Sequence, residues 1–127
     1  MELIIVVVIV GILTAIAYPN YQLFVARAKR NEAKAALLKI AINQEKYYLQ
    51  NSNFTLDMTQ LSFSTDPFVT DSGTYSVTVA AADASNFLAV ATYQNADSEA
   101  GKCLTFKIDG RGTKSSAPDT DCWARSR

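Results

Sequence analysis

The side chains that most often carry enzyme chemistry are sparse or absent in this sequence. None of its 127 residues is histidine, which removes the usual proton-transfer group near neutral pH and the commonest metal ligand. Two cysteines do not complete a zinc site, and the acidic residues lack EF-hand spacing. There is no glycine-rich phosphate loop and no pair of carboxylates in an apolar setting. The sequence therefore predicts no catalytic residues, no metal and no cofactor, and a protein that is not an enzyme.

The two cysteines are the first candidates for another kind of chemistry. Cys103 and Cys122 are separated by eighteen residues. A single pair in an exported domain is typical of a disulfide. Closing a loop of this size would contribute roughly 3 kcal/mol to stability on the chain-entropy model. The alternative is a pair of unpaired structural thiols.

Glu2 is the carboxylate with the most unusual setting. It precedes sixteen uncharged residues, from Leu3 to Tyr18, that read LIIVVVIVGILTAIAY. If apolar residues surround it in lipid or in a filament core, an unpaired carboxylate is costly and usually functional. The alternative is a glutamate at the exposed start of a helix, where the helix dipole favours it.

The apolar run is predicted to be a retained anchor helix. Sixteen residues make a helix of roughly 24 Å, which is short for a hydrocarbon core of about 30 Å. A cleaved signal peptide is the alternative, but the chain starts with Met1-Glu2 rather than with basic residues. Gly11 and Pro19 are the weak points of this helix, and Pro19 is expected to kink or locally melt it. The side chains expected in the membrane or filament core are Leu3, Ile4, Ile5, Val6, Val7, Val8, Ile9, Val10, Ile12, Leu13 and Ile16.

The helical pattern continues from Tyr21 to Gln50 without glycine or proline. One face is expected to pack on the rest of the chain, and a narrower apolar stripe on the opposite face favours contact with a neighbouring chain. A helix over residues 2–50 would be about 73 Å long, against roughly 30 Å for a globule built from the other residues. The N-terminal part of the helix, which would extend beyond the globule and which we call its bare half, therefore needs lipid or other copies of the chain to cover it. The first face comprises Ala33, Ala36, Leu37, Ile40, Ala41, Gln44, Tyr47 and Tyr48, and the opposite stripe comprises Leu38, Ile42 and Leu49.

The remaining residues predict a small antiparallel sheet. Residues 51–73 are polar and turn-prone, which predicts a loop with one short helical turn. Alternating patterns predict strands at Thr74–Ala80, Phe87–Tyr93 and Cys103–Ile108, the last with Leu104, Phe106 and Ile108 on one face. The Asp109-Gly110 dipeptide indicates a hairpin into a fourth strand near residues 113–115. The expected fold is α+β, a long helix (about residues 2–50) packed against a four-stranded antiparallel sheet. Residues 1–22 form the anchor, and residues 23–127 form a globular head.

The N-terminal residues resemble those of type IV pilins. The resemblance lies in the sequence MELIIVVVIVGILTAIAYPNYQ, with its glutamate, apolar run, Gly-Ile-Leu, Ala-Ile-Ala and Tyr-Pro. The following ARAKRNEAKAALLKIAINQEKYY, the Cys-Leu-Thr strand and the terminal Cys-Trp look like the minor-pilin branch of this family.

The resemblance implies a subunit held in the inner membrane and then assembled into an extracellular helical filament by dedicated machinery, with other minor pilins as possible partners. It implies a chain that starts three residues earlier, after a cleaved leader, with a methylated N-terminal residue. Glu2 would pair with the N-terminal amine of a neighbour, and Gly11 and Pro19 would bracket a segment that melts in filaments. Cys103 and Cys122 would form the disulfide that bounds the variable C-terminal region.

Two other functions share this architecture. The first is a receptor for nucleic acid at the pilus surface, an unfavoured partner class, with six positive charges in the last 26 residues: Lys102, Lys107, Arg111, Lys114, Arg125 and Arg127. The second is a pseudopilin of a type II-like secretion system, which often has a calcium loop in place of a disulfide.

Overall fold

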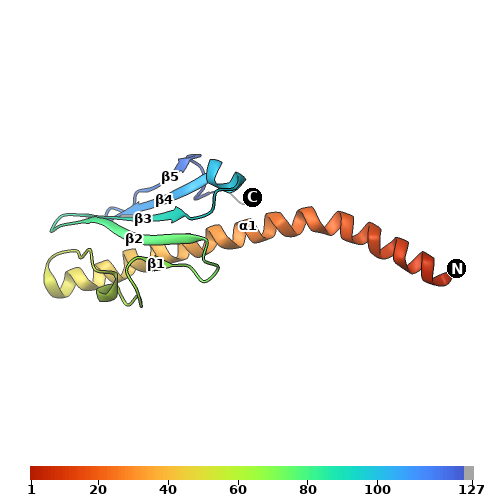
Figure 1. The fold of residues 1–127 in the computed structure, drawn as a ribbon. Helices are drawn as coiled ribbons and strands as arrows, with labels where there is room; N and C mark the ends of the chain where they lie inside the picture. Colours follow the sequence, from red (N-terminus) through yellow and green to blue (C-terminus); the bar gives the residue numbers. More distant parts are fainter. Residues whose placement is uncertain (125–127) are drawn as a thin grey trace.

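The computed structural model describes residues 1–124, and for residues 17–23 it describes the backbone alone. A 50-residue helix, α1, runs from Glu2 to Asn51 and projects far beyond a small sheet (Figure 1). At 1.5 Å per residue it is about 75 Å long. The predicted rod and its projection from its own globule are thus confirmed.

The helix is continuous through the backbone of residues 17–23, so the local melting expected at Pro19 is not found. The side chain of Pro19 lies outside the described residues, and a kink caused by its ring stays a prediction. Figure 1 shows α1 as a bent rather than a straight rod. At its C-terminal end, Ser52 adopts a left-handed conformation, and its N–H donates to Tyr48 O at 2.7 Å.

The sheet has five strands rather than the four predicted. Its order is β1-β2-β3-β4-β5, and every neighbouring pair is antiparallel. The additional strand, β1, has only two residues, too few to show an alternating pattern, and it follows Asp66-Pro67 within the predicted loop. That loop also holds the expected helical turn, the 3-10 helix η1. The remaining bounds are η1 Met58–Leu61, β1 Phe68–Val69, β2 Tyr75–Ala82, β3 Phe87–Tyr93, the 3-10 helix η2 Ser98–Gly101, β4 Cys103–Asp109 and β5 Lys114–Pro118.

The core lies between the second half of α1 and one face of the sheet, and we call this packed part the head (residues 24–124). Ala33, Leu37 and Ile40 are fully buried, as the helical spacing predicted, whereas Leu38, Ile42 and Leu49 are exposed on the other side of the helix. Tyr48 departs from the expected face, since its side chain is exposed while its ring stacks on Phe54. The inward residues of the strands include Tyr75, Val77, Ala89, Ala91 and Phe106.

The prediction for the inner face of β4 is wrong at Leu104. Phe106 and Ile108 are buried, but Leu104 is exposed while Cys103 is buried. The cause is an irregularity in the β4–β5 register between Cys103 and Thr105. A bulge shifts the alternation by one residue, so that the cysteine rather than the leucine faces the core.

The predicted β4–β5 hairpin is present, and its two glycines have different roles. Gly112 adopts a φ of 81°, which favours glycine. Gly110 has an ordinary φ but lies so close to Asn86 that a Cβ would come within 2.5 Å of Asn86 Oδ1. That oxygen accepts a hydrogen bond from Gly110 N at 2.7 Å. The first glycine of the hairpin therefore allows close approach between two loops, and the second allows the turn.

Candidate assembly surface and disulfide-bounded region

The first turns of α1 present apolar side chains that contact nothing in the head. The eleven predicted core residues, from Leu3 to Ile16, are each between 52% and 76% exposed. By contrast, the inner stripe of the same helix from Ala33 to Ile40 is buried. Contiguous exposed apolar surface of this kind marks an interaction site. The bare half of the helix therefore presents a contiguous apolar surface, and its contact with lipid or with other copies of the chain stays a prediction.

Glu2 lies in the first turn of α1 and is exposed, and its side chain has no ion pair with another described residue. A Cβ added at Gly11 would meet nothing within 4 Å, so packing within the chain does not explain the glycine. The predicted assembly roles of Glu2, Gly11 and Pro19 therefore stay predictions. Among the described residues, no helical segment combines the length and the apolar character needed to cross a membrane.

Arg30 is the first buried side chain of α1 among the described residues, and it anchors η2 to the helix. Its Nε and Nη2 donate to the two Glu99 carboxylate oxygens at 2.7 and 2.8 Å. The two side chains are 4% and 15% exposed, so this bidentate ion pair is largely removed from water. Arg30 Nη1 is buried without a hydrogen-bond partner in the described structure.

The loop that carries Glu99 is fixed from the sheet side by two tyrosines. Tyr93 Oη donates to Asp97 Oδ2 at 2.7 Å, and Asp97 Oδ1 accepts from Glu99 N at the start of η2. Tyr75 Oη donates to Cys103 O at 3.1 Å. Burial raises the pKa of the Tyr75 hydroxyl, and the charge of Glu99 raises it further, so this donor keeps its proton. The network places η2 and the beginning of β4 relative to α1.

Cys103 and Cys122 form a disulfide with a Cα–Cα distance of 5.9 Å, which confirms the predicted bridge. Both residues are buried. Behind the bridge, Trp123 packs edge-on against Phe106, and its Nε1 donates to Ser115 O at 2.7 Å. Lys34 Nζ donates to Trp123 O at 3.1 Å. The end of the chain is thus tied to β5 and to α1 as well as to β4.

The sequence profile of the family described as "Type IV minor pilin ComP, DNA uptake sequence receptor" matches residues 19–107, more than half of the chain. The chain belongs to this family. It is a type IV pilin, a structural subunit rather than an enzyme, as the sequence predicted.

One relative identified by sequence is also a type IV pilin. The Type IV major pilin protein PilA of Myxococcus xanthus (strain DK1622) is 38% identical over 63 residues, which are 50% of this pilin and 29% of that protein. The match thus spans less than a third of that relative's length.

Two solved structures share the fold. The non-core minor pilin PilV of Neisseria meningitidis has a TM-score of 0.55 at 21% identity, covering 74% of this chain and 88% of that one. A type IV pilin from Shewanella oneidensis has a TM-score of 0.51 at 24% identity, covering 79% and 99%. At these identities the likeness establishes the pilin fold and nothing beyond it.

The four basic residues of the C-terminal region that the structure describes do not form one cluster. Lys102 precedes β4 and Arg111 follows it, so that a strand of roughly 23 Å separates them. Lys107 and Lys114 lie on the paired strands β4 and β5, and Lys114 Nζ is 5.4 Å from the centroid of the Trp123 ring. The other two predicted residues of this set, Arg125 and Arg127, lie outside the described residues.

Two features of this pilin were not anticipated from the sequence. Arg30 reads as part of a basic cluster with Arg27 and Lys29, yet it is buried. Its spacing to Ala33 and Leu37 places it on the inner stripe, and that signal could have identified it. The second feature is a contact between α1 and the loop before β2. Glu32 forms no ion pair within the described residues, and its Oε2 accepts from Ser72 N and Oγ at 3.3 and 2.9 Å.

Proposed function

We propose that this chain is a minor subunit of a type IV pilus. The bare half of α1 holds it in the inner membrane before assembly and then packs with the helices of other pilins inside an extracellular filament. The observation that carries the proposal is the exposure of the apolar side chains from Leu3 to Ile16 on a helix whose later turns are buried. Transfer of such side chains from water is favourable by about 25 cal/mol per Å², so both environments stabilise the chain relative to a free monomer.

The behaviour of the full chain without detergent tests this proposal. We expect the full chain to enter lipid vesicles or to form fibres when detergent is removed, and antibodies against the head to label sheared surface filaments in electron micrographs. A chain that begins at Val25 should remain monomeric in light scattering, because it retains only the part of α1 that the head covers. A full chain that stays a compact water-soluble monomer would refute the proposal.

DNA binding is a second candidate function, favoured by the family description. The supporting feature is a group of cations and aromatic rings at the disulfide-bounded end of the chain. Lys114 lies over Trp123, and Lys34 Nζ is 5.9 Å from the Phe106 centroid. Partial burial lowers the pKa of the Lys34 ammonium, and the charge of Arg30 lowers it further. Lys114 is therefore the stronger candidate for a phosphate contact, whereas the strand register places Lys107 on the other face of the sheet.

Salt dependence provides the test of DNA binding. Each phosphate contact contributes about 0.9 to the slope of log affinity against log salt. We expect Lys114→Gln to bind duplex DNA more weakly, with a slope shallower by about 0.9. Lys39→Gln is the matched control, since Lys39 lies over Phe63 near β1 at the other edge of the sheet. No gel retardation of DNA at low salt would exclude this function, and an equal loss in the control would exclude this site.

A further inference from the structure

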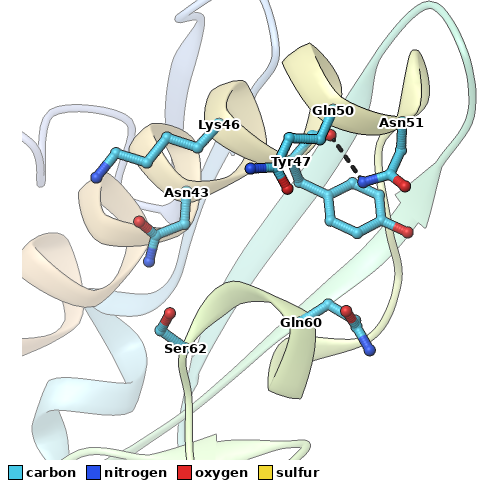
Figure 2. A pocket seen from close by; sticks show the side chains of 7 residues that line it. All are labelled: Asn43, Lys46, Tyr47, Gln50, Asn51, Gln60 and Ser62. Atoms are coloured by element: carbon cyan, nitrogen blue, oxygen red, sulfur yellow. Dashed lines mark hydrogen bonds between the residues drawn. The ribbon is translucent and has the colours of Figure 1, made fainter.

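A polar groove lies between the last turns of α1 and η1 (Figure 2). It has a volume of about 350 Å³, at the lower end of the range for small-molecule sites. The helix contributes Asn43, Lys46, Tyr47, Gln50 and Asn51. The other wall consists of Gln60 in η1 and Ser62 just after it. We propose that this groove binds a small acidic saccharide, that is, a sugar ring with a carboxylate. This binding goes beyond the proposed role of the chain in a pilus.

The chemistry of the lining favours a polyhydroxylated ligand. Four of the side chains are carboxamides, each of which presents donors and an acceptor in one plane. Neighbouring hydroxyls of a sugar ring also offer donors and acceptors side by side, and they match such groups in pairs. Tyr47 supplies the one ring of the groove, between the amides of α1 and Gln60 (Figure 2). Its face is apolar and suits the C–H face of a pyranose.

The charge of the groove favours an anion. Lys46 brings one positive charge, and none of the described lining residues carries a carboxylate. Within the described part of the chain Lys46 makes no ion pair. One cation complements one ligand carboxylate, whereas a nucleic-acid backbone requires a series of basic contacts. A folded protein partner would require an apolar centre, which this groove lacks.

Two side chains of the groove are held in place by hydrogen bonds to the backbone. Asn43 Nδ2 donates to Leu61 O at 2.7 Å, and Asn51 Nδ2 donates to Tyr47 O at 3.1 Å. These bonds orient both amides, and each leaves the amide oxygen available for a ligand hydroxyl. Leu61 is fully buried and fixes η1 to the core. Fixed polar groups reduce the entropy lost on binding.

Buried Gln44 strengthens the same region from behind. It pairs with the backbone of Thr55 through two hydrogen bonds, of 2.7 and 3.0 Å, and thereby holds the segment that connects α1 to η1.

The position of the groove also fits a binding role. It lies at the end of the head opposite the bare half of α1 (Figure 1).

A titration of the full chain in dodecylphosphocholine micelles, which lack sugar head groups, tests the proposal. The probes are glucuronate and galacturonate, with glucose and galactose as their neutral counterparts. We expect either uronate to shift the side-chain amide NMR signals of Asn43, Gln50, Asn51 and Gln60 saturably, with a dissociation constant on the order of 1 mM. The neutral sugars should bind several-fold more weakly.

Exposed residues allow variants that leave the fold intact. The double variant Gln50→Ala/Gln60→Ala should weaken uronate binding at least tenfold, since about 1.4 kcal/mol of lost hydrogen bonding corresponds to a factor of ten. Lys46→Gln should remove the preference for uronate over the neutral sugar. The matched control is Gln94→Ala, an exposed carboxamide just after β3, and it should bind as the parent does.

Three results would overturn the proposal. The first is the absence of saturable shifts at the four amides with any of the four sugars. The second is an equal loss of affinity in Gln94→Ala and in the double variant. The third is tighter binding of a deoxynucleotide monophosphate at the same amides, which would assign the groove to nucleic acid.

Discussion

Replacing Glu99 with alanine is expected to lower the free energy of unfolding of the head by about 3–5 kcal/mol. The substitution removes both acceptors of Arg30 and leaves a guanidinium that is 4% exposed without a counter-charge. Arg30 Nη1 already lacks a hydrogen-bond partner in the described structure. Few other acceptors are therefore within reach of the guanidinium once the carboxylate is removed. The loss equals a large share of the stability of an ordinary small domain.

Trp123 is the single tryptophan of the chain, and its ring packs on Phe106, so its fluorescence during urea unfolding measures the effect. Glu45→Ala is the control, since Glu45 is exposed, and it should change stability by no more than about 0.5 kcal/mol. The apolar double replacement Arg30→Met/Glu99→Leu should recover most of the loss, because the cost comes from the unpaired charge. If Glu99→Ala unfolded at the same urea concentration as the parent, the ion pair would not anchor the head.

Replacing Glu2 with alanine is expected to reduce incorporation into filaments at least tenfold while the head stays folded. In the proposed assembly the Glu2 carboxylate is surrounded by apolar helices and is retained because a cation of a neighbouring chain pairs with it. Removal of the carboxylate leaves that cation buried and unpaired, at a cost of about 3–5 kcal/mol. Quantitative immunoblots of sheared filaments, relative to the total amount of the chain, measure the effect.

Two variants identify the cause of such a loss. Glu2→Gln keeps the shape of the side chain and removes its charge, and it should be as defective as Glu2→Ala. Glu45→Ala removes an exposed glutamate from the covered part of the same helix and should assemble normally. Normal filament yield from Glu2→Gln would show that the charge of Glu2 has no part in assembly.

Much of the architecture could be read from local patterns. The 3.6-residue spacing of Ala33, Leu37 and Ile40 identified the face that packs on the sheet, and the period of two identified the inward residues of β2. These signals are local because helices and strands each repeat over a few residues. The patterns failed where the chain is irregular. Leu104 faces outward because a bulge changes the register, and β1 is too short to have a period.

The candidate site divides in the same way. The apolar run and the glutamate before it are contiguous in sequence, so the sequence alone identifies the proposed assembly surface. The Arg30–Glu99 pair and the groove are not contiguous. The pair joins residues 69 positions apart, and the groove joins the end of α1 to Gln60 and Ser62. No local pattern records which distant loop packs beside a given turn of a helix.

The sequence by itself determined that this protein has a helix too long for its own globular part and a single pair of cysteines. It also lacks the residue patterns that are typical of catalytic sites. These properties depend on length, composition and short-range spacing. Only the tertiary structure decided that Arg30 is an internal anchor rather than a surface charge, and that four amides and one lysine surround a common groove. Burial and proximity arise from long-range packing, and the same side chain acquires a different role when the surrounding water is removed.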